Sequence, residues 1–139
     1  MKARTKGQIE AEISEAVIKF EKEYMGRGPL ETKTYIIDDL VLVRLKGVLT
    51  PAEYQLAKTS DSSRGRDLIK QTRIELLERG RALLEAVVES ITGRRVTTLH
   101  TDISTVIGER VIIFGLEASP DFECVGETRS KSRDPSQEQ

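Results

Sequence analysis

The sequence predicts a single α+β domain with elements in the order α-ββ-α-α-ββ. In this domain an N-terminal helix and a long helix pack on a four-stranded, mainly antiparallel sheet. Three observations lead to this prediction: apolar residues recur at helical spacing in two stretches, strand-like runs occur in two pairs around short turns, and no segment repeats at the spacing of a solenoid. A chain of 139 residues also has the length of one domain.

The first helix is predicted to begin at Thr5. Thr5 and Gln8 form the T-x-x-Q pattern of a capping box, in which two side chains satisfy free backbone groups at the start of a helix. An apolar stripe then follows at spacings of three and four residues, comprising Ile9, Ile13, Val17, Phe20 and Tyr24.

The helix is predicted to end in the loop YMGRGPL, residues 24–30. Gly26 suits the left-handed position beyond a helix, and Pro29 restricts Gly28 and prevents the helix from continuing. This interpretation does not account for Arg27, whose guanidinium group suits a carboxylate, carbonate or phosphate group. The loop is therefore either a helix stop only or half of an anion site.

Two strands and a short helix are predicted next. The runs TKTYII (32–37) and LVLVRL (40–45) flank Asp38-Asp39, which suits a tight hairpin turn. Residues 40–43 are all apolar, which is typical of a central strand with both faces covered. A helix is expected from Pro51 to about Lys58, because Thr50 can cap it and Glu53 can reach back to the cap.

The polar run SDSSRGR (60–66) is predicted to be a loop, and a long helix is predicted to follow over roughly residues 66–92, before Gly93. The apolar face of that helix is assigned to Ile69, Leu76, Gly80, Leu83, Val87 and Ile91, widened by Leu77, Leu84 and Val88.

A second hairpin is predicted from residues 95–103 and 110–116, around the turn STVIGE. Its run VIIFGL (111–116) is again apolar on both faces. Because three helices, one of them short, are too few to cover both faces of such a sheet, we expect a homodimer to complete the core. Apolar residues become rare after Glu117, so the sequence predicts a folded domain over residues 1–117 and a disordered tail over 118–139.

The composition argues against several classes of function. With 22 Lys and Arg residues against 23 Asp and Glu, the net charge of −1 lacks the basic excess of a nucleic-acid binder. The one cysteine, Cys124, cannot form an intramolecular disulfide or a zinc cluster. No apolar run approaches 18 residues and no signal-peptide pattern is evident, so we expect a cytoplasmic protein.

Basic residues gather where the long helix is predicted to begin, at Arg64, Arg66, Lys70 and Arg73. Free N–H groups and the helix dipole favour anions at that end of a helix, so basic side chains there are unfavourable unless an anion or acidic group offsets them. Two interpretations stay open. One is a solvated face in which Asp67 pairs locally, and the other is a site for an anion or an acidic partner.

His100 and Asp102 are two residues apart on a predicted strand, so both point to one face of the sheet. A catalytic triad needs its nucleophile, histidine and carboxylate to converge, whereas side chains on one strand face point the same way. One histidine also supplies too few ligands for a metal site. We therefore predict no catalytic residues, metal or cofactor, and expect His100 to form a hydrogen bond at a sheet edge or an interface.

The chain resembles the MpsC family of small bacterial proteins, which is named after a sodium-translocating, membrane-potential-generating system. The match spans Ile9 to about Phe114 and is carried by EAEISEAVIKFEKEYMGRGP, LVLVRLKGVLTPAEYQLA, LIKQTRIELLERGR and ITGRRVTTLHTDISTVIGERVIIF. The resemblance implies an accessory protein of a sodium or bicarbonate uptake system with a membrane-protein partner, and it implies no catalytic residues. The motifs KQTR and GER add Arg73 and Arg110 to Arg27 as candidates.

Two functional hypotheses follow. The first is a non-enzymatic accessory or regulatory protein that acts through a dimer and a surface for an anion or acidic partner, built from Arg27, Arg64, Arg66, Lys70, Arg73, His100 and Arg110. The alternative is a small enzyme for an anionic metabolite, with His100 as acid or base. The enzyme needs His100 and at least two of Arg27, Arg73 and Arg110 to line one pocket.

Overall fold

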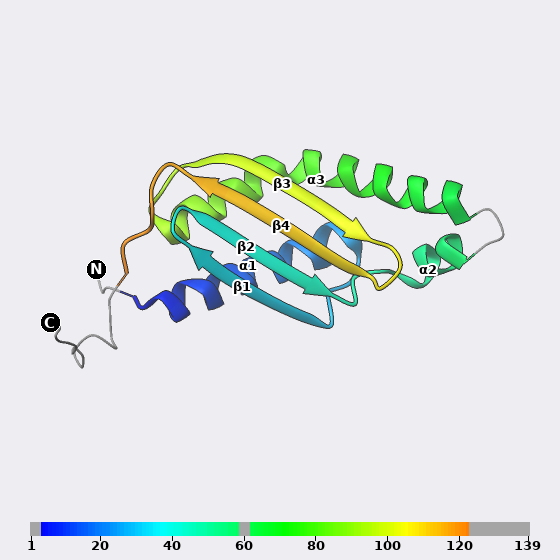
Figure 1. The fold of residues 1–139 in the computed structure, drawn as a ribbon, viewed down its shortest axis with the longest axis horizontal. Coiled ribbons are helices and arrows are strands. Elements are labelled where there is room, and N and C mark those ends of the chain that lie inside the picture. The colour runs from blue at the N-terminus through cyan, green and yellow to red at the C-terminus, as the bar shows by residue number, and fades with distance from the viewer. Residues whose placement is uncertain (1–3, 59–61, 123–139) are drawn as a thin grey trace, which may run out of the picture.

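The computed structural model describes residues 4–58 and 62–122 (Figure 1). Its elements are α1 (Lys6–Met25), β1 (Glu31–Ile37), β2 (Leu40–Lys46), α2 (Pro51–Lys58), α3 (Ser62–Thr92), β3 (Val96–Ser104) and β4 (Glu109–Leu116). This order confirms the predicted α+β class and the α-ββ-α-α-ββ arrangement of one domain. None of the described helices is long and apolar enough to cross a bilayer.

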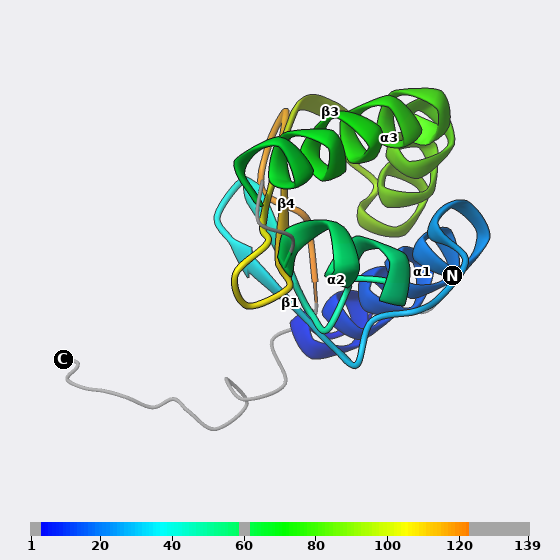
Figure 2. The same cartoon turned by 90° about the vertical axis from the view of Figure 1, so that its right-hand side faces the viewer.

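The four strands form one sheet in the order β1-β2-β4-β3, and each neighbouring pair is antiparallel. The two hairpins thus lie side by side, and the most apolar strands, β2 and β4, occupy the centre. Helices α1 and α3 lie on one face of the sheet, which we call the inner face, and no described helix lies over the other, outer face (Figure 2). The helices of one chain therefore leave the outer face of the central strands uncovered, as expected from their number, and Leu40 of β2 is 42% exposed there.

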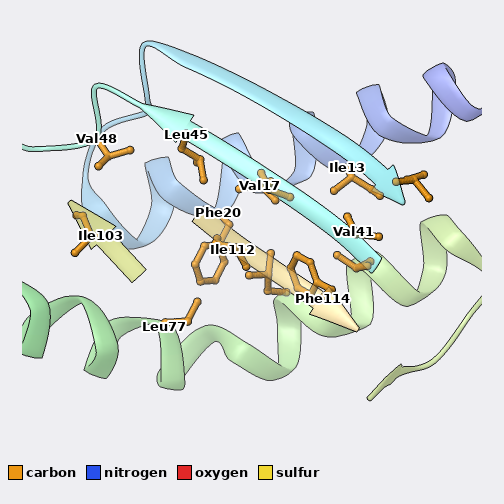
Figure 3. Close-up of a cluster of buried hydrophobic side chains, with 14 of the residues drawn as sticks. Ile13, Val17, Phe20, Val41, Leu45, Val48, Leu77, Ile103, Ile112 and Phe114 are labelled. Atoms are coloured by element: carbon orange, nitrogen blue, oxygen red, sulfur yellow. The ribbon is translucent and has the colours of Figure 1, made fainter. Parts of the chain in front are cut away.

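The core lies between the inner face and the two long helices (Figure 3). Inward-pointing residues of the central strands are fully buried there, including Val41, Val43, Leu45, Ile112 and Phe114. They pack against one stripe of each helix, formed by Ile9, Ile13, Val17 and Phe20 of α1 and by Ile69, Leu77, Leu84 and Val88 of α3.

Both predicted capping boxes are present. The Gln8 N–H donates to the Thr5 hydroxyl and the Thr5 N–H donates to the Gln8 side chain, at 3.1 and 2.9 Å. At the start of α2 the same exchange joins Thr50 and Glu53, at 3.2 and 2.9 Å. Gly26 follows α1 with φ 85°, the left-handed conformation expected of a helix stop. Local sequence signals therefore set the boundaries of α1 and α2.

Helix α3 begins at Ser62 rather than near Arg66, so the predicted loop is helical from residue 62 onward, and residues 59–61 lie outside the described residues. Gly65, which suggested a loop, is buried inside the helix. A Cβ at this position would lie 2.0 Å from the carbonyl oxygen of Leu56, so glycine permits the close approach of α2 to α3. The glycine is there for packing rather than to break the helix.

The buried face of α3 also differs from the prediction. Leu83 is 52% exposed and Leu76 and Val87 are half-buried, whereas Arg73 is buried in line with Ile69 and Leu77. Two apolar stripes run along this helix, one through Leu76 and Leu83 and one through Leu77 and Leu84. The sequence pattern assigned the first stripe to the core, but the second is the buried one. The buried stripe contains Arg73, and a charged residue at that position made the stripe look solvent-exposed in the sequence.

The chain remains packed beyond Glu117. Pro120 is buried, Phe122 packs against the core, and the Arg94 guanidinium donates to the carbonyl oxygen of Ser119 at 2.9 Å. Residues 123–139 of the predicted tail, with Cys124, lie outside the described residues.

Candidate functional site

Four charged side chains meet inside the domain, and we call them the buried charge cluster: Glu21 of α1, Glu53 of α2, Arg73 of α3 and Arg110 of β4. The side chains of Glu21, Arg73 and Arg110 are only 1–2% exposed, and that of Glu53 is 16% exposed. Charges so far from water must be paired to be tolerated. Each charge of the cluster therefore depends on a partner within it.

Glu21 is shared between the two arginines. Its Oε1 accepts from Arg73 Nη1 at 3.3 Å, and its Oε2 accepts from Arg110 Nη1 at 2.9 Å. Glu21 follows Ile13 and Val17 at steps of four, so it continues the buried stripe of α1. This spacing was the sequence signal for a buried carboxylate. The sequence-based assignment of Glu21 to the solvent-exposed side of the helix, as a charged residue, is therefore wrong, since Glu21 is 1% exposed.

Arg73 also binds Glu53 with the two-pronged geometry that suits a guanidinium and a carboxylate. Its Nε and Nη2 donate to the two carboxylate oxygens at 2.9 and 2.7 Å, and Nη2 donates to the carbonyl oxygen of Val48 at 2.7 Å. Burial opposes ionisation of Glu53, but hydrogen bonds from Arg73 and from Thr50 outweigh it and hold the pKa of Glu53 below its ordinary value.

Arg110 lies on the inner face of β4, opposite Leu45 and Ile103 on the flanking strands. Its Nε donates to the hydroxyl of Thr101 at 3.2 Å. Burial lowers the pKa of Arg110, Glu21 opposes this and nearby Arg73 adds to it, yet a guanidinium remains charged in proteins. The two arginines and two carboxylates of the cluster balance to zero net charge, so the cluster requires no further anion.

Arg27 lies outside the cluster and binds main-chain oxygens. Its Nη1 donates to the carbonyl of Leu49 at 3.1 Å, and its Nε donates to that of Gly28 at 3.4 Å. The carbonyl of Val48, one residue before Leu49, is held by Arg73. Two of the arginines singled out from the sequence thus hold the connection between β2 and α2.

The basic residues at the start of α3 divide into two groups. Arg73 points inward, whereas Arg64 is exposed, Arg66 is half-buried and Lys70 is exposed. Lys70 Nζ lies 3.4 Å from Asp102 Oδ1. Lys70, Arg73 and Arg110 border one small cavity of about 60 Å³, together with Ile74, Thr101, Asp102 and Ile103.

His100 is exposed on the outer face of β3, opposite Ile113. Arg110 points to the inner face, and His100 does not border the cavity that Arg73 and Arg110 share. Asp102 accepts hydrogen bonds from the Ile103 N–H and from Lys70, which hold the pKa of Asp102 below its ordinary value. Within a single chain His100 and Arg110 therefore lie on opposite faces of the sheet. The described residues also hold no group of three His, Cys, Asp or Glu side chains that could bind a metal ion.

Comparison with known proteins gives one family and one relative. The family model described as Na+-translocating membrane potential-generating system (MpsC) matches residues 5–118. A protein of Bacillus subtilis (strain 168), "Uncharacterized protein YbcI", is 47% identical over 113 residues, which make up 81% of this chain and 89% of that protein. No solved structure matches the chain. The resemblance seen in the sequence is confirmed.

We expect Glu21→Gln to destabilise the protein by about 3–5 kcal/mol, because it removes a buried charge and leaves two buried arginines with one carboxylate between them. Glu23→Gln, at an exposed position of the same helix, is the matched control and should change stability by no more than about 0.5 kcal/mol. Urea unfolding measures both. Equal values for the two variants would show that the cluster carries little of the stability.

The cluster should also make stability depend on pH. A carboxyl group whose pKa is lowered by folding stabilises the folded state above its unfolded pKa of about 4.3, and that contribution is lost as the pH falls through the lower folded value. We therefore expect Glu53→Gln to be less stable than the native protein at neutral pH and the difference to shrink below about pH 4. Urea titrations at several pH values test this, and a difference that stays constant down to pH 3 would contradict it.

Proposed function

This chain belongs to the MpsC family, and we propose that it is a non-enzymatic accessory or regulatory protein of a sodium- or bicarbonate-linked membrane system. It acts as a homodimer and presents a basic surface to an acidic partner or anion. The observation that carries this proposal is that Arg27, Arg73 and Arg110 are engaged within the domain while one face of the sheet stays uncovered.

The absence of a reaction centre is supported by how the arginines are used. Arg73 and Arg110 are neutralised by Glu21 and Glu53, and Arg27 binds main-chain carbonyl groups. An arginine that holds an anionic substrate needs donors directed at the substrate. His100 lies on the opposite face of the sheet from Arg110, so the acid or base of the enzyme hypothesis is separated from its proposed substrate holders within one chain.

Dimerisation is supported by the outer face of the sheet. Tyr35, Ile37 and Leu40 are 41–53% exposed there on adjacent strands. A contiguous apolar patch on a sheet face is typical of a protein interface. The partner surface is assigned to Arg64, Arg66 and Lys70 near the start of α3, since Arg73 is withdrawn into the domain.

The dimer is tested by light scattering. We expect a particle of about 31 kDa, twice the 15.6 kDa of one chain. Leu40→Lys should raise the dimer dissociation constant at least about tenfold by placing a charge in the apolar contact. Leu83→Lys, at a similarly exposed apolar residue on α3, should leave it unchanged. The reverse pattern would place the interface on the helices, and a native monomer at all concentrations would end the proposal of a dimer.

The role itself is tested in a bacterial strain that lacks this protein, with a potential-sensitive dye as the readout. We expect His100→Gln to restore the membrane potential as well as the native protein does, because glutamine keeps the size and hydrogen bonding of histidine but cannot transfer protons. Leu40→Lys should fail to restore it. Loss of function in a dimeric His100→Gln variant would favour the enzyme, and an unchanged potential in the deletion strain would separate this chain from membrane energisation.

A further inference from the structure

The strand register divides the outer face of the sheet into an apolar half and a charged half. Residues paired across the four strands form rows, and alternate residues of each strand point outward. The two rows nearest the β1–β2 turn supply the apolar half. Its large apolar side chains are Tyr35, Ile37, Leu40, Leu42 and Ile113, and His100 of β3 stands at its edge. The other two rows supply the charged half.

The charged half is itself asymmetric. Its basic residues, Lys33, Arg44 and Lys46, stand on β1 and β2. Two of its acidic residues, Asp102 and Glu109, stand on β3 and β4. A third acidic residue, Glu31, lies at the β1 end of the outermost row. Arg44 of the first hairpin pairs with Glu109 of the second within one chain. The remaining charges leave the first hairpin net positive, through Lys33 and Lys46 against Glu31, and the second negative, through Asp102.

We infer that the occupant of this face is a second copy of the chain. A two-fold axis relates the two copies; it lies between the two outer faces, parallel to the strands and above the boundary of β2 and β4. This inference rests on the proposed dimer and specifies its geometry. Such an axis exchanges the two hairpins, so β1 lies over the partner subunit's β3. Lys33 then faces Asp102 of the partner subunit, and Lys46 faces the partner's Glu109.

The same operation stacks apolar half on apolar half. Leu42 lies over the partner's Ile113, and Tyr35 lies over the partner's His100. Aligned packing of two sheets in this way is the ordinary geometry of a β-sandwich. The face is thus complementary to itself in both charge and polarity, which is the requirement for an isologous interface.

Other two-fold arrangements fit less well. With the axis across the strands, full overlap sets Lys33 over the partner's Tyr35 and places a charged row on an apolar row. If only the two apolar halves overlap, no charged row lies on an apolar row, but the contact area falls by half. The four rows and four strands give a footprint of roughly 19 by 27 Å, and a standard interface takes about 800 Å² of accessible surface from each partner. Full overlap is therefore needed to approach that size.

The remaining sequence is a poor occupant. Residues 123–139 contain Val125 as their only Val, Leu, Ile, Met or aromatic residue and are rich in charge. Such a segment has too little apolar surface to cover the apolar half.

A charge exchange between Lys33 and Asp102 tests the arrangement. Lys33 makes no ion pair among the described residues, and Asp102, whose side chain is 75% exposed, has room for a second cation beside Lys70. Lys33→Asp and Asp102→Lys should each raise the dimer dissociation constant at least about tenfold, because each creates two like-charge contacts. The double variant should return to within about threefold of the native value.

Sedimentation of the full chain at 50 mM and 500 mM NaCl gives the readout, and circular dichroism checks that each variant is folded. If Asp102→Lys does not fold, Lys33→Asp with Asp102→Asn replaces the double variant and should dimerise more tightly than Lys33→Asp alone. Glu75→Lys with Arg79→Glu, on the exposed side of α3, is the matched control and should have no effect.

The outcomes separate the two levels of the proposal. A native protein that stays monomeric overturns both the dimer and its geometry. A native dimer that is insensitive to the single variants, or that the double variant fails to restore, overturns the two-fold arrangement alone and leaves the dimer standing. Recovery in the double variant, with weaker dimers in high salt, supports the facing charges.

Discussion

The fold depends on one carboxylate. Glu21 neutralises two arginines that are almost completely buried, and through them it joins the first helix to the long helix and to β4, the last strand along the chain. Arg73 extends the same network to Glu53 at the start of α2. Isolated charges in such a place would cost several kcal/mol each, so the positions of these four elements are coupled. Apolar packing makes the domain compact, and the ionic network fixes which face of each element turns inward.

This constraint explains why the sheet is covered on one side only. The network ties α1 and α3 to the inner face, where Arg110 points, and no described helix lies over the outer face. Arg27, Arg73 and Arg110, which the sequence suggested as ligands for an anion, instead bind groups of the protein itself. The patterned outer face and the basic residues at the start of α3 remain at the surface, and the proposed binding role uses these two surfaces.

The sequence predicted features that are encoded locally. Thr5 with Gln8, Thr50 with Glu53, and the glycine after α1 are signals within a few residues of the boundaries that they set. The pairing of β2 with β4 could not be predicted, because the residues of a strand do not specify which distant strand pairs with it. The inward turn of Arg73 was also missed, because its partners Glu21 and Glu53 lie 52 and 20 residues away. An interpretation based on periodicity places charged residues at the surface, whereas Glu21 and Arg73 lie in the core.

The reach of the network along the chain has a consequence for synthesis. Glu21 and Arg110 are separated by 89 residues, so their contact closes a long loop and belongs late in folding. While the ribosome has not yet released β4, α1 has one of its two buried ionic partners and β2 lacks its central neighbour. In a chain that is still being synthesised, the edge of β2 would therefore stay unpaired and exposed to other chains until β3 and β4 have been made. Elongation rate and chaperone access over the last quarter of the domain should accordingly matter more for yield than any feature of the N-terminal half.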